Sequence, residues 1–199
     1  MPPRSDRPKL VLGLTGSNAA GKGEVAEYLR EQGFTLHSLS DIVREEAAAR
    51  GLPPDREHLI RIGNELRRDG GPGVLAERIL PRLGPRDVVD SVRNPAEVRV
   101  LRRIPYFVLL GVTAPMELRF RRALARGRPG DPPTLEGFRE REAQENTLDP
   151  HAQRLAATLE LADHVVGNDG SLAGLRRGID ALLHDLEDAA RSKDASSGP

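Results

Sequence analysis

Short apolar runs alternate along the chain with longer segments in which apolar residues recur every three or four positions. The apolar runs lie at 9–14, 34–39, 87–91, 106–112 and 164–167, and each has the length of a buried strand. Helical spacing predicts helices over 24–30, 41–50, 56–68, 73–83, 95–103, 115–126, 134–145, 152–161 and 171–186. This alternation predicts an α/β fold, with a five-stranded parallel sheet covered by helices on both faces.

Length and composition limit the class of protein. The 199 residues suit a single domain over 9–187, and the polar ends at 1–8 and 188–199 are predicted to be flexible tails. Thirty basic and thirty acidic residues cancel, so we expect neither nucleic acid nor membrane as a partner. The chain has no cysteine, which excludes disulfides and thiolate chemistry. No segment has the character of a signal peptide or a membrane span, so a cytoplasmic protein is expected.

A glycine-rich segment, Gly-Ser-Asn-Ala-Ala-Gly-Lys-Gly at 16–23, connects the first predicted strand to the first predicted helix. Its glycines allow backbone N–H groups to turn inward around a polyphosphate, and the helix directs its positive dipole end at the same anion. An ordinary glycine-rich turn is the alternative, but spacing, lysine, strand and helix all favour a phosphate-binding loop. The predicted ATP-binding residues are Gly16, Ser17, Asn18, Ala19, Ala20, Gly21, Lys22, Gly23 and Glu24.

Lys22 is the predicted catalytic cation of this loop. Only three of the thirty basic residues are lysines, so a compact ammonium stands where phosphate-binding loops use a point charge. Gly23 occupies the position at which a Ser or Thr hydroxyl usually ligates Mg²⁺. We therefore expect the metal to be held mainly by phosphates, waters and a carboxylate elsewhere in the chain.

Near the carboxyl ends of the second and third predicted strands, a carboxylate is followed three residues later by an arginine. In a parallel α/β sheet, the carboxyl ends of the strands form the ligand crevice. Asp90 is predicted to orient hydrated Mg²⁺ or the acceptor, and Arg93 to clamp an acceptor phosphate, with a structural ion pair between them as the alternative. Ser40 or Asp41 is expected to cap the next helix, and Arg44 projects from its first turn. An ordinary cap beside a solvated arginine is the alternative.

Arginines gather around the strongest loop signal of the chain, Gly-Arg-Pro-Gly-Asp-Pro-Pro at 127–133. Arg119, Arg122 and Arg126 share one predicted helix face, where like charges repel unless an anion or solvent lies between them. We predict an arginine lid over about 119–146 that hinges in this loop, with Arg128 catalytic and Arg122 and Arg141 contacting substrate. A solvated basic face is the alternative for at least two of the five arginines at 119, 121, 122, 126 and 128.

From residue 10 to about 183, the motifs resemble the P-loop kinase group that contains adenylate, cytidylate and dephospho-CoA kinases. The segment 90–93 is similar to the Asp-Gly-x-x-Arg element of these kinases, and their Gly-Lys-Gly matches 21–23. The chain is most similar to an uncharacterised, mostly archaeal branch that is adenylate-kinase-like or dephospho-CoA-kinase-related. That branch also has Ser-x-x-Asp-x-x-Arg, a Glu-Val pair as at 97–98, and Arg-Gly-Arg-x-x-Asp-Pro as at 126–132.

The resemblance implies a P-loop NTP hydrolase/kinase fold, ATP and Mg²⁺ as cofactors, and acceptor-binding helices over about 41–83. It implies that Asp41, Arg44 and Arg93 bind the acceptor and that Asp90 faces the metal. Dephospho-CoA kinases carry a segment similar to Asn-Asp-Gly-Ser-Leu at 168–172 beside the adenine, which gives Asn168 a predicted adenine contact; a turn-forming role is the alternative.

Three functions remain open on the sequence. The first is a nucleoside or deoxynucleoside monophosphate kinase, supported by Arg44, Arg93 and the arginine lid. The second is dephospho-CoA kinase, supported by Asn168 and by the helix at 56–68, which would line a pocket for a longer substrate. The third is an ATP-binding regulatory protein, which Gly23 keeps open. The expected partners are a nucleotide and a small phosphorylated acceptor, and the expected state is a monomer or homodimer.

Overall fold

The protein is described by a computed structural model that covers residues 8–128, 130–146 and 148–196. Within these residues a five-stranded sheet has the order β2-β3-β1-β4-β5, and its four strand pairings are parallel. The strands are β1 (Leu10–Thr15), β2 (Thr35–Ser38), β3 (Arg86–Asp90), β4 (Phe107–Thr113) and β5 (His164–Gly167). The predicted fold class is confirmed.

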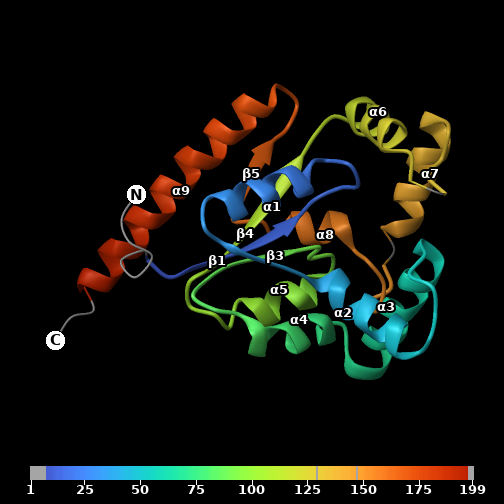
Figure 1. The fold of residues 1–199 in the computed structure, drawn as a ribbon, viewed down its shortest axis with the longest axis horizontal. Helices are drawn as coiled ribbons and strands as arrows, with labels where there is room; N and C mark the ends of the chain where they lie inside the picture. The colour runs from blue at the N-terminus through green and yellow to red at the C-terminus, as the bar shows by residue number, and fades with distance from the viewer. Residues whose placement is uncertain (1–7, 129, 147, 197–199) are drawn as a thin grey trace.

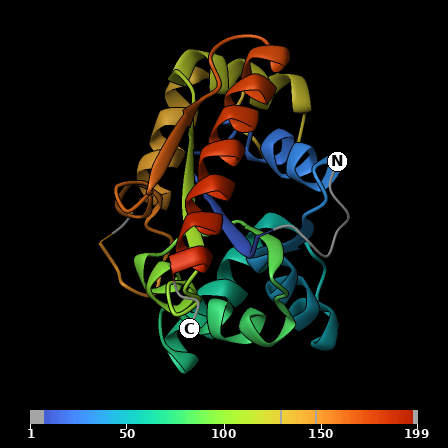
Figure 2. The ribbon, with the colours of Figure 1, turned by 90° about the vertical axis from the view of Figure 1, so that its left-hand side faces the viewer.

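Helices cover both faces of the sheet (Figure 1). One face carries α1 (Lys22–Glu31) and α9 (Leu172–Ser196), and Figure 2 shows α9 lengthwise beside β5. The other face carries α2 (Leu39–Ala49), α4 (Val74–Ile79) and α5 (Pro95–Leu101), with α3 (Arg56–Gly70) against α2 and α4, and α8 (Leu155–Leu159) against α5. The pair α6 (Met116–Arg126) and α7 (Leu135–Glu145) stands beyond the sheet on the side of α3 (Figure 1).

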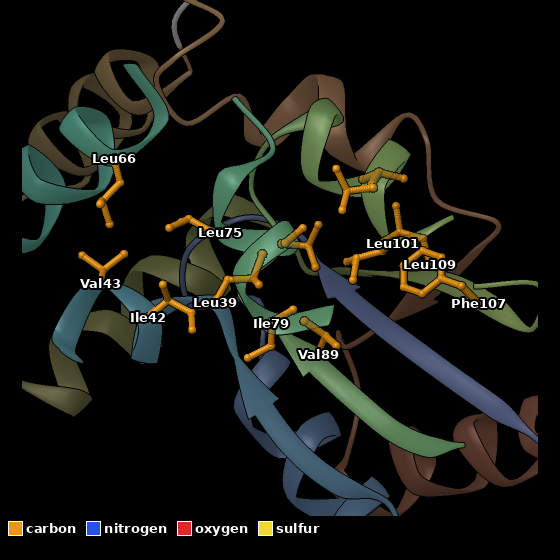
Figure 3. Close-up of a cluster of buried hydrophobic side chains, with 14 of the residues drawn as sticks. Leu39, Ile42, Val43, Leu66, Leu75, Ile79, Val89, Leu101, Phe107 and Leu109 are labelled. Atoms are coloured by element: carbon orange, nitrogen blue, oxygen red, sulfur yellow. The ribbon is translucent and has the colours of Figure 1, made fainter. Parts of the chain in front are cut away.

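Two hydrophobic clusters fix the sheet between these layers. Because successive side chains of a strand point to opposite faces, β1 contributes to both: Val11 packs into the cluster with α2, α4 and α5, whereas Leu10, Leu12 and Leu14 pack with α1 and α9. Figure 3 shows the first cluster, with Leu39 and Ile42 of α2 toward one end and Leu101, Phe107 and Leu109 together at the other. This packing fixes the carboxyl ends of β1 and β3 in position beside α2.

Two helices have boundaries that differ from the prediction. The helix α2 begins at Leu39, and its cap is Ser38, whose side chain accepts from the Ser40 N–H at 3.2 Å. The prediction that Ser40 or Asp41 caps this helix was therefore wrong. The helix predicted over 73–83 divides into α4 and a 3-10 turn, η2 (Leu80–Arg82), which contains a proline.

The helix predicted over 152–161 is shortened to α8 because tertiary hydrogen bonds engage the backbone before it. The Arg154 N–H donates to the Arg93 carbonyl at 2.8 Å. The Asn94 side-chain amide donates to the carbonyls of Pro150 and Ala152, at 2.8 and 2.9 Å. The segment 150–154 is thus tied to the loop that follows β3.

The chain ends also differ from the predicted tails. Pro8 is buried at the start of β1, and α9 continues to Ser196 instead of ending near 187. An ion pair of 2.7 Å between Arg86 and Glu187 fastens α9 to the amino end of β3. The remaining tail residues, 1–7 and 197–199, lie outside the described residues. In the described chain, no helix combines the length and apolarity that crossing a membrane requires.

Candidate functional site

The loop between β1 and α1 has the backbone of a phosphate cradle. Gly16 and Gly21 have φ values of 136° and 104°, which residues with a Cβ rarely adopt. A Cβ would lie 2.1 Å from the Val112 carbonyl oxygen at Gly16, and 2.0 Å from Asn168 Nδ2 at Gly21. The helix α1 has no side-chain cap, so its first N–H groups and its dipole are available to an anion.

Lys22 closes over this loop. Its Nζ donates to the carbonyls of Gly16 and Ser17, at 2.7 and 3.0 Å. Burial lowers the pKa of Lys22 to about 8; Arg93 acts in the same direction and Asp90 opposes them. The ammonium is therefore desolvated and surrounded mostly by positive charge, an environment that an anionic ligand would relieve.

The other residues of the loop lie as follows. Ser17, Asn18 and Ala19 are partly exposed on the loop, and Ala20 is buried. Gly23 and Glu24 are exposed in the first turn of α1, and a Cβ at Gly23 would have no neighbour within 4 Å. The predicted contacts of these residues with ATP stay predictions.

Asn168, from the turn after β5, forms hydrogen bonds that support the phosphate-binding loop. It is buried, its Nδ2 donates to the Ala20 carbonyl at 2.9 Å, and its Oδ1 accepts from Arg122 at 3.3 Å. Arg122 in turn lies 3.5 Å from the Ala20 carbonyl oxygen. Asn168 and Arg122 thus position the phosphate-binding loop, and their predicted contacts with adenine and substrate remain untested.

Asp90 ends β3 next to β1 and presents one free oxygen. Its Oδ2 accepts from the Ser91 hydroxyl at 3.2 Å, and its Oδ1 is buried without a hydrogen-bond partner in the described residues. Nowhere in the described chain do three His, Asp or Glu residues gather as a metal cage. A single free carboxylate oxygen fits Mg²⁺, which keeps several waters and takes further ligands from phosphates.

A cavity of about 470 Å³ opens between the phosphate-binding loop, α2, α3 and the end of β3. Asn18 and Lys22 line it on the side of the loop. Its cations are Arg44, Arg56, Arg67, Arg93 and Arg128, and its apolar wall consists of Leu39, Val43, Leu59, Ile60, Leu75 and Leu155. The sequence-predicted residues Lys22, Arg44, Arg93 and Arg128 are therefore brought together.

Arg93 and Arg44 enter this cavity differently. Burial lowers the pKa of Arg93, against the opposing charges of Asp90 and Glu145. Its Nη1 donates to Gln153 Oε1 at 3.2 Å, so among the described residues it does not form the direct pair with Asp90 that a structural role predicts. Arg44 is half-exposed and lies 2.5 Å from Asp41 Oδ1.

Three predicted substrate residues do not line the cavity: Arg122, which contacts Asn168 and the Ala20 carbonyl instead, Asp41 and Arg141. Asp41 is exposed and lies outside the lining, where it restrains Arg44 instead. Arg141 also lies outside the lining: it donates to the Gly130 carbonyl and stands 3.9 Å from Asp131 Oδ1. Arg128 does line the cavity, and burial, with Arg126 next, lowers the pKa of its guanidinium.

Carboxylates neutralise several lid arginines. Asp131, 5% exposed, accepts from Arg126 at 2.9 Å and lies 3.5 Å from Arg56. Arg56, the first residue of α3, also pairs with Glu145 of α7. The helix α3 and the segment predicted to form a lid are therefore joined by ion pairs in this structure.

Sequence reasoning missed several residues of the site. Arg119 is buried and binds Glu142 with two hydrogen bonds, at 2.6 and 2.9 Å, and it reaches the Asn18 carbonyl at 3.4 Å. It belongs to the predicted arginine face, but the partner 23 residues away could not be foreseen. Arg56 gave no signal in the sequence. Ser91, which lines the cavity, could have been noticed because it stands where the resemblance has glycine.

Glu97 is a further residue for which the sequence predicts no role. It is fully buried; its Oε1 accepts from Arg67 at 2.8 and 3.1 Å, and its Oε2 accepts from the N–H groups of Arg93 and Asn94, at 2.8 and 3.0 Å. It thus ties α3 to the loop that carries Arg93. Removing one member of such a buried pair costs about 3–5 kcal/mol.

A parallel sheet with this loop at the carboxyl end of β1 has the fold of the P-loop kinases. No family model matches the chain. Over 182 residues it is 36% identical to the UPF0200 protein of Hyperthermus butylicus, covering 89% of this chain and 95% of that protein. It is 32% identical to the UPF0200 protein of Pyrococcus abyssi, covering 89% and 97% of the two chains. The chain belongs to the UPF0200 family.

Solved structures agree with this fold. The crystal structure of TT1252 from Thermus thermophilus is 26% identical, with a TM-score of 0.58, over 90% of this chain and 99% of that chain. A putative kinase from Chloroflexus aurantiacus is 16% identical, with a TM-score of 0.55, over 90% and 98% of the two chains. Shikimate kinase from Bacteroides thetaiotaomicron is 14% identical, with a TM-score of 0.51, over 88% and 98%. The last two likenesses concern the fold alone.

Proposed function

We propose that this protein is an ATP-dependent kinase that phosphorylates a small phosphorylated acceptor, a nucleoside or deoxynucleoside monophosphate. The observation that carries the proposal is the shared cavity, in which the lysine of the phosphate-binding loop faces Arg93, Arg44 and Arg128. Transfer between two phosphates brings two anions together, so it needs cations on both sides of the reacting atoms. A protein that only binds ATP has no use for the second set.

In this proposal each side chain has a distinct task. The loop N–H groups and Lys22 hold the β- and γ-phosphates of ATP, and Arg93 and Arg44 hold the acceptor phosphate. An acceptor phosphate oxygen attacks the γ-phosphorus while the bond to the β-phosphate oxygen breaks, and ADP leaves. Arg128 stabilises the charge on the transferring group. Magnesium, when bound, would neutralise phosphate charge, and Asp90 is the carboxylate that would face it.

The size and lining of the cavity support a mononucleotide. About 470 Å³ lies within the range of small-molecule sites, and the aliphatic wall of α2 and α3 suits the faces of a nucleobase. The same wall also suits the apolar arm of dephospho-CoA, which keeps dephospho-CoA kinase as the second candidate. A regulatory protein would be expected to expose a contiguous apolar patch. The exposed large apolar residues of the described chain, Leu124, Leu148, Val165 and Leu172, instead lie on separate segments.

A coupled ADP-release screen tests the proposal. Nucleoside monophosphates, deoxynucleoside monophosphates and dephospho-CoA are each added with Mg·ATP, and Lys22→Ala provides the background. We expect one monophosphate class to raise ADP release above hydrolysis without acceptor. Stimulation by dephospho-CoA alone would select the second candidate. ATP binding without stimulation by any acceptor would favour the regulatory function.

A further inference from the structure

Ser91 has a backbone conformation that serine disfavours. Its φ is +64°, in the left-handed region where a Cβ is crowded and where glycine is preferred. The residue is 7% exposed, and it lines the cavity next to Lys22 and Arg93. Glycine would fit this backbone with less strain, so the serine side chain must supply something that glycine lacks.

The Ser91 hydroxyl acts on Asp90. It donates to Asp90 Oδ2 at 3.2 Å and so occupies one oxygen of this carboxylate. The other oxygen, Oδ1, is buried and has no hydrogen-bond partner within the described ranges. Asp90 also stands among the charges that set the pKa of Lys22, which places the carboxylate at the phosphate-binding loop. The hydroxyl thus fixes a carboxylate whose free oxygen is beside the expected phosphates.

The loop itself lacks the hydroxyl that ordinarily follows the lysine. Gly23 has no side chain, and a Cβ placed there would meet nothing within 4 Å, so no neighbouring side chain fills that space. Residue 23 itself therefore offers the metal no side-chain oxygen. The end of β3, next to β1 in the sheet, provides one.

We propose that Ser91 is a positioning residue for magnesium: its hydroxyl holds Asp90 so that Oδ1 is presented to the Mg²⁺ of bound Mg·ATP. The pair Asp90 and Ser91 then takes over the role of the hydroxyl missing at Gly23. The inference rests on the proposed function in one respect, since it requires that the loop binds Mg·ATP. It requires no particular acceptor.

Binding measurements with a non-hydrolysable ATP analogue test this without turnover. The variants Ser91→Ala and Ser91→Gly are compared with the wild type by Mn²⁺ electron paramagnetic resonance, with Mg²⁺ as competitor. Loss of a group that orients a metal ligand should weaken the apparent Mg²⁺ affinity about 10-fold in both variants. Affinity for the analogue in EDTA should change less than about 2-fold, because the loop N–H groups and Lys22 remain in place.

A stability measurement and one control variant exclude a general loss of structure. Ser91→Gly should keep its Tm within about 2 °C of the wild type, because relief at φ +64° offsets the added freedom of the unfolded chain. Ser171→Ala removes a hydroxyl that accepts from the Gly174 N–H at 3.1 Å on the exposed start of α9, and it should leave Mg²⁺ affinity unchanged.

The outcomes separate the two proposals. If the wild type binds Mg·ATP analogue and both Ser91 variants keep its Mg²⁺ affinity, the role of Ser91 is overturned and the proposed function stands. If the Ser91 variants lose as much affinity for the metal-free analogue as for Mg²⁺, Ser91 acts on the loop, and the inference is also overturned. If the wild type binds no nucleotide, the proposed function fails and the inference falls with it.

Discussion

The phosphate-binding loop and the lid face the same cavity, but different forces hold them. The loop is fixed by close packing, with Gly16 against the Val112 carbonyl and Gly21 against the Asn168 amide. The lid helices α6 and α7 bury few apolar side chains, chiefly Ala123 and Phe138. Several ion pairs also hold them, including Arg119 with Glu142, Arg126 with Asp131, and Arg56 with Glu145.

This difference indicates how each region responds to a ligand. Packed backbone has one arrangement and is insensitive to salt, so the loop is ready for phosphate before phosphate arrives. A guanidinium that pairs with a carboxylate can instead exchange that partner for a phosphate. Carboxylates and phosphates both present anionic oxygens that accept hydrogen bonds from its N–H groups. We therefore expect a preformed loop and an adjustable lid.

The largest effect is expected at the loop. Lys22→Ala should lower kcat by at least about 100-fold, because charge is lost at the phosphates. Its Tm should stay within about 4 °C of the wild type, since the side chain fills little of the core. Kinetics with the acceptor identified by the screen and thermal unfolding measure the two. Lys9→Ala, at an exposed lysine just before β1, is the matched control and should leave turnover unchanged. Near wild-type turnover of Lys22→Ala would show that the loop is misassigned.

The acceptor arginines come next. Arg93→Ala should raise the KM for the acceptor about 10- to 100-fold, which corresponds to the loss of one charged hydrogen bond. Arg44→Ala should raise this KM less, because Arg44 is half-exposed. Arg128→Ala should chiefly lower kcat, because a lid cation contacts the phosphoryl group best in the transition state. Steady-state kinetics with both substrates varied separate these effects. Equal changes in ATP affinity for all three variants would contradict this assignment of acceptor binding to Arg93 and Arg44 and of transition-state stabilisation to Arg128.

The pKa of Lys22 gives a pH dependence for the loop. Below about pH 8 the ammonium is charged in the free protein, and above it the proton is lost. ATP-analogue affinity should therefore fall as pH rises above about 8, by up to about 10-fold per unit. In Lys22→Arg the side chain stays charged over this range, so its ATP-analogue affinity should not decrease above pH 8, whatever its turnover. Titration calorimetry between pH 7 and 9.5 measures both proteins, and a flat wild-type profile would contradict the assignment.

The smallest effect, confined to the lid, is expected for Asp131→Asn. Arg126 and Arg56 lose the carboxylate they share, so hydrogen exchange across 125–136 should be faster than in the ligand-free wild type. A bisubstrate analogue that joins ATP to the acceptor should slow exchange in both proteins, because its phosphates replace the carboxylate, and ATP alone should slow it less. Fast exchange that no ligand changes would exclude a kinase lid and favour the regulatory function.

The sequence predicts those features that depend on local order. The strands, the loop and the meeting of Lys22, Arg44, Arg93 and Arg128 follow from apolar periodicity and from the rule that parallel strands end at one edge. The φ of Ser91 and the partners of Arg119 and Arg56 depend on tertiary contacts between distant segments, which no local pattern encodes. The same cause shortened the helix predicted over 152–161, where Arg93 and Asn94 engage its backbone.

The buried amide of Asn168 has a consequence for the order of assembly. The glycines and lysine of the loop lie near the start of the chain, whereas the side chain that binds the Ala20 carbonyl follows 148 positions later. Domains form during synthesis from the amino end, and contacts of such separation close last. A nascent chain that has made β1 and α1 therefore carries the loop sequence without its support. The proposed nucleotide site is completed only when β5 adds to the edge of the sheet, so nucleotide binding, if the proposed function holds, would report a fully folded protein.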